Sequence, residues 1–376
     1  MFLQRTLQKS IFHALTTSGK VIVLYGPRQA GKTTLSKAII AQTGLKSLLV
    51  NADQLKYIDV LSSRDLKKIQ SLVNGYDLLF IDEGQRIPDI GINLKILHDE
   101  IPELKVFVTG SSSFLLSNKV TEALTGRKKI YTLLPVSMQE LALQFNKFEL
   151  NDQLEERLIY GQYPEVITSK SLSEKEDYLH EITTSYLFKD ILELESIRYP
   201  MKIRDLLKLL AFQVGSQVSI NELCNTLKLN RETVDRYLFL LEQSFIVFRL
   251  TAFSSNFRNE IRKSQKFYFY DNGIRNMIID NMNSLKTRND VGVLWENFIV
   301  SERKKKLLYG GTRVNTYFWR NYAGVELDIV EEKNGELKAF EIKYKKARRK
   351  APKAWADNYG GDYSCITKDN YLEYIL

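Results

Sequence analysis

The chain has 376 residues, of which 44% are hydrophobic, and a formal net charge of +9. This is enough apolar sequence for two or three domains with buried cores. Two cysteines and three histidines argue against a disulfide framework and against a structural zinc site. No run approaches the roughly 18 uncharged apolar residues of a membrane span, and the N-terminal segment lacks the pattern of a secretory signal. We therefore expect a globular, cytoplasmic protein with no membrane partner.

The first motif, residues 26–33, has the spacing G-x-x-x-x-G-K-T of a phosphate-binding loop. It lies between an apolar β-branched run, 20–25, and a stretch with helical periodicity, 33–42. In such a loop the backbone N–H groups surround the β-phosphate, Lys32 reaches the β and γ oxygens, and the Thr33 hydroxyl ligates Mg²⁺. The sequence therefore predicts a nucleoside triphosphate site, without fixing the base. Its nucleotide-binding residues are Gly26, Pro27, Arg28, Gln29, Ala30, Gly31, Lys32, Thr33 and Thr34.

Acidic and hydroxyl side chains follow two further strand-like runs. Asp82 ends the run 77–82 and Glu83 follows it, and we expect Asp82 to hold Mg²⁺ and Glu83 to polarise the attacking water. Ser111 and the two serines after it follow the run 105–109, where short hydroxyls would meet the γ-phosphate or would serve as turn residues. Arg127 could neutralise charge on the transferred phosphoryl group, from this subunit or from a neighbour, or lie on the surface.

Short β-like runs alternate with helical stretches from Lys20 to about Leu134. This pattern predicts an α/β fold with a parallel sheet. Ligands of such sheets bind beyond the carboxyl ends of the strands, so the phosphate loop, Asp82 and Ser111 should converge on one edge. The expected strands are 20–25, 47–51, 77–82, 105–109 and 129–134.

Amphipathic helices take over after Pro135. The segment 204–250 has the order helix, short helix, turn, helix and strand that is typical of a winged helix-turn-helix. Its expected recognition helix follows Asn230 and presents a face of mixed charge. Such a face suits a protein contact as well as DNA. The outward residues are Arg231, Glu232, Asp235 and Arg236.

From Val291 onward the order helix, three strands, helix and strand matches the core of restriction-endonuclease-like folds. Asn334-Gly335 predicts a two-residue hairpin turn that places Asp328 opposite Glu341 and Glu326 opposite Lys343. Strict alternation along both strands would then put these four side chains on one face.

Two opposed carboxylates repel each other unless a cation lies between them. One interpretation is a divalent metal bound by Asp328 and Glu341, with Lys343 beside a scissile phosphate. Glu296, on the preceding helix, resembles the additional acid of such nucleases. The other interpretation is a solvent-facing hairpin whose acids are balanced by Lys343 and nearby arginines. The basic runs 303–306 and 343–353 are compatible with nucleic acid, but a charge run is by default a solvated face.

The segments GPRQAGKTTL, LLFIDEGQRIPD, VFVTGSSS and LTGRKKIYTLLPVSMQEL together resemble AAA+ ATPases that carry a C-terminal domain of uncharacterised function. The resemblance covers nearly the whole chain, through residues 160–165, 186–190, 269–273 and 294–297. It implies ATP as the nucleotide, assembly into a homo-oligomer, and a strand ending at Thr109 between the other two strands of the site. The domains it implies are a P-loop ATPase domain at 1–135, a helical lid or connector at 136–200, a winged helix at 201–285 and a nuclease-like α/β domain at 286–376.

The leading hypothesis is a Mg²⁺-dependent ATPase whose nucleotide state positions the winged helix and the nuclease-like domain on DNA. Lys32, Glu83 and Arg127 would be its catalytic residues. The alternative is a nucleotide-gated switch that binds a protein partner and has no nuclease activity. A metabolic kinase is less favoured, since nothing after the loop suggests a pocket for a small-molecule acceptor.

Overall fold

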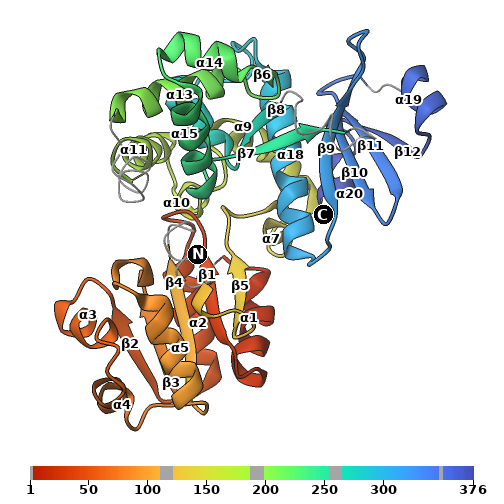
Figure 1. The fold of residues 1–376 in the computed structure, drawn as a ribbon. Coiled ribbons are helices and arrows are strands. Elements are labelled where there is room, and N and C mark those ends of the chain that lie inside the picture. The colour runs from red at the N-terminus through yellow and green to blue at the C-terminus, as the bar shows by residue number, and fades with distance from the viewer. Residues whose placement is uncertain (1–2, 111–121, 187–198, 254–264, 347–349) are drawn as a thin grey trace. The chain divides into compact units, whose positions relative to one another are not determined.

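Figure 1 shows a computed structural model of the chain, which describes residues 3–110, 122–186, 199–253, 265–346 and 350–376. These residues form two compact units. Unit 1 extends to Pro135 and includes Tyr186, and unit 2 contains the other described residues from Val136 onward. Among the helices that the structure describes, none has the length and apolar character needed to cross a membrane.

A five-stranded parallel sheet with the order β2-β3-β4-β1-β5 forms the centre of unit 1. β1 is buried along its whole length, as expected for an apolar parallel strand covered on both faces. The parallel α/β sheet predicted from the sequence is confirmed, and β4 lies between β3 and β1 as the resemblance implies. The strands are β1 (Val21–Tyr25), β2 (Ser47–Asn51), β3 (Leu78–Asp82), β4 (Lys105–Gly110) and β5 (Lys128–Thr132).

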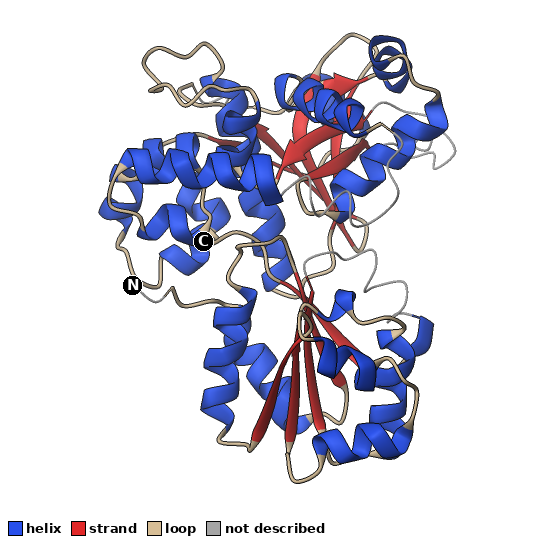
Figure 2. Cartoon of the chain, turned by 90° about the vertical axis from the view of Figure 1, so that its left-hand side faces the viewer, coloured by secondary structure: helices blue, strands red, loops and turns tan. Residues whose placement is uncertain are grey.

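Helices lie on both sides of this sheet (Figure 2). α2 begins at Lys32, directly after the phosphate loop, and ends before Gly44, whose φ of 68° suits a glycine cap. The Asp65 side chain caps α4 by accepting hydrogen bonds from two backbone N–H groups of its first turn. The helices are α1 (Leu7–Thr17), α2 (Lys32–Thr43), α3 (Leu55–Leu61), α4 (Leu66–Val73), the 3-10 helix η1 (Gly84–Arg86) and α5 (Ile90–Glu100).

Unit 2 begins with a series of helices, in agreement with the sequence. Capping boxes start α7, α8 and α11. In each of them the N-cap residue, which directly precedes the helix, exchanges hydrogen bonds with the third residue of the helix. The helices are α7 (Met138–Leu141), α8 (Lys147–Asp152), α9 (Leu154–Tyr160), α10 (Pro164–Thr168), α11 (Leu172–Glu181), the π-helix η2 (Ile182–Tyr186), α13 (Pro200–Phe212), α14 (Ile220–Leu227), α15 (Arg231–Gln243), α17 (Asn272–Ile278), α18 (Val291–Tyr309), α19 (Lys353–Asn358) and α20 (Tyr371–Ile375).

A seven-stranded mixed sheet with the order β12-β11-β10-β9-β7-β8-β6 runs through unit 2. The sequence divides this region into three domains, but β7 pairs with β9 and joins the strands on both sides of residue 285 into one sheet. The whole region therefore forms one compact unit. Its strands are β6 (Gln217–Val218), β7 (Val247–Ala252), β8 (Gln265–Phe269), β9 (Asn315–Arg320), β10 (Glu326–Lys333), β11 (Glu336–Ile342) and β12 (Asp362–Ile366).

The β10–β11 hairpin has the predicted turn and register. Asn334 and Gly335 have φ of 53° and 85°, and Lys333 pairs with Glu336. However, β10 shifts its register against β9 between Leu327 and Val330, so both of these residues pack in one core cluster. The strict alternation predicted for this stretch is therefore wrong, because a bulge adds a residue to one strand and resets which face the next residues occupy.

Candidate nucleotide site and a second acidic cluster

The phosphate loop connects β1 to α2 at the edge where the parallel strands end. Gly26 has a φ of 153°, and a Cβ there would lie 1.9 Å from the carbonyl oxygen of Leu133, so only glycine fits. Gly31, directly before the helix, adopts a left-handed conformation with a φ of 90°. The loop thus combines two positions that favour glycine with the N-terminus of a helix, which is the arrangement that binds phosphate.

Lys32 is the first residue of α2, and its side chain is 5% exposed. Its ammonium group donates hydrogen bonds to the carbonyl oxygens of Gly26 at 2.9 Å and Pro27 at 2.8 Å. These oxygens carry no formal charge, so neither of them neutralises the Lys32 ammonium. The structure therefore places the cation that the sequence predicts within the loop itself.

Asp82 ends β3 and accepts hydrogen bonds from one hydroxyl of α2 and one of β4. The Thr33 hydroxyl donates a hydrogen bond to Asp82 Oδ2 at 2.9 Å, and the Thr109 hydroxyl donates to Asp82 Oδ1. Hydroxyl and carboxylate oxygens are hard ligands of the kind that Mg²⁺ prefers. Thr33 and Asp82 therefore fit the ion predicted from the sequence. Sequence reasoning does not single out Thr109, because a threonine within an apolar strand is an ordinary β-former.

Glu83 lies at the same edge, in a left-handed conformation with a φ of 56°. Its N–H donates to Thr109 Oγ1 at 3.2 Å, and its carboxylate accepts a hydrogen bond from the Gln85 amide. A non-glycine residue in this conformation is uncommon and often marks a functional site. Glu83 is thus held next to Asp82, at the carboxyl end of β3. Ser111 and the two serines after it lie outside the described residues.

Arg127 lies at the amino end of the parallel strands, opposite the end that carries the phosphate loop. β5 begins at Lys128, which pairs with Val21 at the start of β1, and the Val21 N–H donates to the Arg127 carbonyl oxygen at 2.9 Å. The phosphate loop follows the far end of β1, about 13 Å away at the usual rise of a strand. Arg127 Nε instead donates to Asp99 Oδ1 at 2.7 Å, and this hydrogen bond lowers the pKa of Asp99. Arg127 therefore lies away from its own phosphate loop, and of the two alternatives that the sequence left open, action in its own subunit or on a neighbour, this position does not support the first.

Arg5 is a buried residue of the site that sequence reasoning missed. Its Nη1 donates to the carbonyl oxygen of Ala30 in the phosphate loop at 2.7 Å, and its Nη2 donates to that of Leu134 at 2.6 Å. One guanidinium group therefore ties the loop to the chain segment that follows β5. A single arginine before the first helix has no pattern in sequence that would reveal this role.

The predicted second site lies in unit 2. Asp328 Oδ2 accepts a hydrogen bond from the Ile342 N–H at 2.6 Å, and Lys343 Nζ lies 3.2 Å from Glu341 Oε1. Asp328 and Glu341 are only 7% and 6% exposed, so the interpretation as a solvent-facing hairpin surface is wrong for these two acids. Burial and the nearby charge of Glu296 raise the pKa of Asp328 to about 7. We call Glu296, Glu326, Asp328 and Glu341 the acidic cluster.

Lys266 of β8 is the residue of this cluster that sequence reasoning missed. Its side chain is 1% exposed, contacts the Glu326 carboxylate and places Nζ 3.7 Å from Glu296 Oε1. Across the described residues, no group of three or more His, Cys, Asp or Glu side chains is arranged to hold a metal ion. Lys266 could not be found from sequence because only the tertiary fold brings β8 to the acids.

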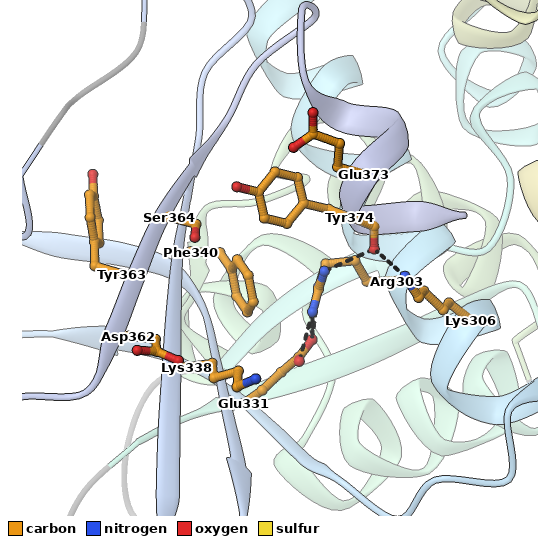
Figure 3. A pocket seen from close by; sticks show the side chains of 10 residues that line it. All are labelled: Arg303, Lys306, Glu331, Lys338, Phe340, Asp362, Tyr363, Ser364, Glu373 and Tyr374. Carbon is orange, nitrogen blue, oxygen red and sulfur yellow. Dashed lines mark hydrogen bonds and ion pairs between the residues drawn. The ribbon is translucent and has the colours of Figure 1, made fainter. Parts of the chain in front are cut away.

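The basic run 303–306 is not a solvated face. Arg303 donates to both carboxylate oxygens of Glu331, at 2.8 and 2.7 Å, and its guanidinium lies 3.9 Å from the centre of the Phe340 ring. Lys305 is fully buried and pairs with Glu302 at 2.7 Å. Arg303 and Lys306 line a cavity of about 450 Å³. Both donate to the Tyr374 carbonyl oxygen there, as Figure 3 shows. These charges are used inside unit 2, which corrects the expectation of a solvated run.

Three family models match separate parts of the chain. Residues 18–142 match an AAA domain, residues 151–285 match a domain of unknown function (DUF8612), and residues 291–368 match a second domain of unknown function (DUF4143). The first match and the parallel sheet of unit 1 support a P-loop ATPase of the AAA type, and with it nucleotide binding and hydrolysis.

The chain is also similar to proteins that are named as uncharacterised in other organisms. A protein of Mycobacterium tuberculosis is 28% identical over 327 residues, which cover 86% of this chain and 70% of that protein. A protein of Methanocaldococcus jannaschii is 27% identical over 339 residues, covering 85% and 74%.

Among solved structures, a Walker-type ATPase of Pyrococcus abyssi gives a TM-score of 0.49 at 14% identity, covering 74% of this chain and 96% of that one. The RuvB Holliday junction branch migration motor of Thermotoga maritima gives a TM-score of 0.34 at 18% identity, covering 66% and 90%.

Proposed function

We propose that the protein is a Mg²⁺-dependent ATPase whose turnover is regulated by DNA bound to unit 2. The observation that carries the ATPase part is the hydrogen bond between Thr33 and Asp82, beside a loop that already holds the Lys32 ammonium. This arrangement brings two Mg²⁺-type ligands and a phosphate-binding cation to one edge of the sheet. The match of residues 18–142 to an AAA domain supports the same conclusion.

Each residue of the site has a task in this proposal. Thr33 and Asp82 would hold Mg²⁺, which supplies positive charge that the phosphate oxygens need during transfer. The Lys32 ammonium would exchange its bonds to loop carbonyls for bonds to the β and γ oxygens of ATP. The Glu83 carboxylate would orient the attacking water and accept its proton. The backbone of residues 26–34 would hold the phosphate chain.

A catalytic role for Arg127 would require a second copy of the chain. Arg127 lies at the amino end of the parallel strands, whereas its own phosphate loop lies at their carboxyl end. Its side chain is 37% exposed, so it is open to a neighbouring molecule once the bond to Asp99 is released. We therefore include a homo-oligomer in the proposal, with Arg127 acting on the nucleotide of the neighbouring subunit.

The DNA part of the proposal rests on the elements of unit 2. The order α13, β6, α14, α15, β7, β8 resembles that of a winged helix, and the order α18, β9, β10, β11, α19, β12 resembles that of a restriction-endonuclease-like core, which supports the proposal. Lys343, Lys345, Lys346 and Lys350 are exposed after β11, where they could contact phosphates. DNA binding to these elements would change the ATPase rate of unit 1.

The alternative is a nucleotide-gated switch that binds a protein partner and does not cleave nucleic acid. One observation favours it: the exposed face of α15 carries an ion pair between Arg231 and Asp235, with Nε and Oδ2 3.5 Å apart. A helix that reads the DNA groove would normally present more uncompensated positive charge.

The experiment is ATP turnover with and without Mg²⁺, and with and without single- and double-stranded DNA, for the wild type and Glu83→Gln. The DNA is then examined on a gel. Turnover that needs Mg²⁺, rises with DNA and is lost in Glu83→Gln supports the proposal. Turnover that does not respond to DNA, with the DNA unbound and intact, favours the switch. Nucleotide binding without any turnover would refute the ATPase part.

A further inference from the structure

The acidic cluster already contains a cation that the protein supplies. Lys266 reaches it from β8, with its ammonium in contact with Glu326 and 3.7 Å from Glu296 Oε1. We propose that Lys266 is the resident counter-ion of the acidic cluster, so that the cluster is an ion-pair network that excludes divalent metal ions. This inference concerns a different site from the proposed ATPase site and does not depend on it.

Protein donors occupy an oxygen of each acid. Glu296 Oε1 accepts a hydrogen bond from the Tyr268 hydroxyl at 2.7 Å, and Asp328 Oδ2 accepts one from the Ile342 N–H at 2.6 Å. Arg320 Nη1 lies 3.5 Å from Glu326 Oε2. A metal ion that bound these same oxygens would have to displace these donors, in addition to the ammonium of Lys266 and the Lys343 ammonium 3.2 Å from Glu341 Oε1.

Lys266 cannot easily leave this position. Its side chain is 1% exposed and lies over the Phe318 ring, with Nζ 5.3 Å from the ring centre. An ammonium this deeply buried needs its anionic partners, because water cannot replace them. Burial alone would lower the pKa of Lys266, but the charges of Glu296 and Glu326 outweigh it and raise that pKa. The lysine therefore stays charged at neutral pH and repels a dication at the same carboxylates.

The charges of the region already come close to balance. Four acids face Lys266, Lys343 and Arg320, which leaves one net negative charge if every acid is ionised. A divalent cation would overcompensate a cluster that needs one unit of positive charge or less.

The test is Mn²⁺ binding, measured by electron paramagnetic resonance on the nucleotide-free full chain. All samples carry Asp82→Asn, so that the ATP site contributes no Mn²⁺ signal. The chain with Lys266 intact should show no Mn²⁺ binding that depends on Asp328. Lys266→Met should create a site that binds Mn²⁺ at least about tenfold more tightly than the chain with Lys266 intact, because the buried acids then lack their cation. Adding Asp328→Asn should remove that site.

A matched control is Lys304→Met, which removes a half-buried lysine that lies over Phe248 in the same unit. It should leave Mn²⁺ binding unchanged. Mn²⁺ binding that depends on Asp328 while Lys266 is present would overturn the proposal, and this arm needs no variant of Lys266. A folded Lys266→Met or Lys266→Gln protein that gains no Mn²⁺ site would overturn it as well. ATP turnover, measured separately with Asp82 intact, tests the ATPase proposal and leaves the Mn²⁺ result unaffected.

Discussion

Asn297 of α18 exchanges two hydrogen bonds with the backbone of Phe269 in β8. Its Oδ1 accepts from the Phe269 N–H at 2.7 Å, and its Nδ2 donates to the Phe269 carbonyl oxygen at 3.1 Å. The side-chain amide thus takes the place of a neighbouring strand at the end of β8. Nδ2 also donates to Asn272 Oδ1 at 2.7 Å, and Asn272 Nδ2 donates to the carbonyl oxygen of Leu158. The motif segments 269–273 and 294–297 are therefore joined inside unit 2 by buried hydrogen bonds.

We expect Asn297→Ala to destabilise unit 2 by about 3 kcal/mol, because it leaves a buried N–H and a buried carbonyl group without their partner. Asn297 has no exposed surface. The measurement is urea unfolding of the full chain, followed by tryptophan fluorescence. Asn283→Ala removes an exposed asparagine of the same unit and should change the unfolding free energy by less than about 0.5 kcal/mol. Equal effects of the two variants would contradict the role of Asn297.

The sheet of unit 1 could be predicted from sequence because its strands are short β-like runs, and two of them, β1 and β3, lead directly to the phosphate loop and to Asp82. The position of Arg127 could not, although its motif was recognised. Arg127 precedes its strand, whereas Asp82 ends its strand. In a parallel sheet these two positions lie at opposite ends of the strands. The direction of the strand, rather than the motif, decides which residues meet.

The second unit shows where sequence reasoning stops. The hairpin of β10 and β11 was predictable because Asn334-Gly335 fixes its register locally. The pairing of Thr251 with Tyr317 and the contact of Lys266 with Glu326 join residues about 60 positions apart, and nothing local encodes them. Those long-range contacts join the strands on both sides of residue 285 in one sheet and bring Lys266 to the acidic side chains of β10 and α18.

Asp82→Asn should lower ATP turnover by about 100-fold, because it removes the negative charge that holds Mg²⁺ beside Thr33. Asp77→Asn provides a matched control at the other end of β3. Asp77 is exposed and accepts a hydrogen bond from the Lys46 N–H at 3.0 Å, far from the phosphate loop. Steady-state hydrolysis over a range of Mg²⁺ concentrations measures both. A similar loss of ATP turnover in both variants would show that any substitution at an end of β3 impairs hydrolysis, rather than the loss of a Mg²⁺ ligand.

Arg127→Ala should leave the affinity for a fluorescent ATP analogue within about twofold of the wild type, since Arg127 lies away from its own phosphate loop. If it acts on a neighbouring subunit, turnover should fall while nucleotide affinity is kept. Mixing Arg127→Ala with Glu83→Gln then gives a distinctive readout. If the active site lies between two subunits, a mixed oligomer pairs the intact Glu83 of one variant with the intact Arg127 of the other. Part of the turnover should then return. Loss of nucleotide affinity in Arg127→Ala would contradict the observed position.

Arg5→Gln should weaken nucleotide binding by about tenfold, because the phosphate loop loses the guanidinium that holds the Ala30 carbonyl group. Titration with the same fluorescent analogue measures it, and circular dichroism confirms that unit 1 is folded. Arg64→Gln is the matched control in unit 1, where Arg64 is about half exposed and pairs with Asp89 at 2.6 Å. Unchanged affinity in Arg5→Gln would show that Arg5 stabilises the fold without shaping the loop.

Asp290, directly before α18, should make stability depend on pH. Arg288 donates to both of its carboxylate oxygens, at 2.8 and 2.9 Å, and Arg275 Nη1 donates to Oδ2 at 2.5 Å. Burial alone would raise the pKa of Asp290, but the hydrogen bonds from Arg288 and Arg275 outweigh it and lower that pKa to about 2. The ionised carboxylate therefore stabilises the fold above about pH 4, and this contribution is lost as the pH falls toward 2.

Asp290→Asn should consequently destabilise the protein more at about pH 6 than at about pH 3, because near pH 3 the carboxylate takes up a proton in the unfolded chain while it stays ionised in the folded protein, so part of its stabilisation is already lost. Urea unfolding of the wild type and the variant at both pH values measures the difference. Asp235→Asn changes an exposed acid of α15 and should have a small effect at both pH values. A destabilisation by Asp290→Asn that does not vary with pH would mean that the two arginines need Asp290 only as a hydrogen-bond acceptor, and not as a charge.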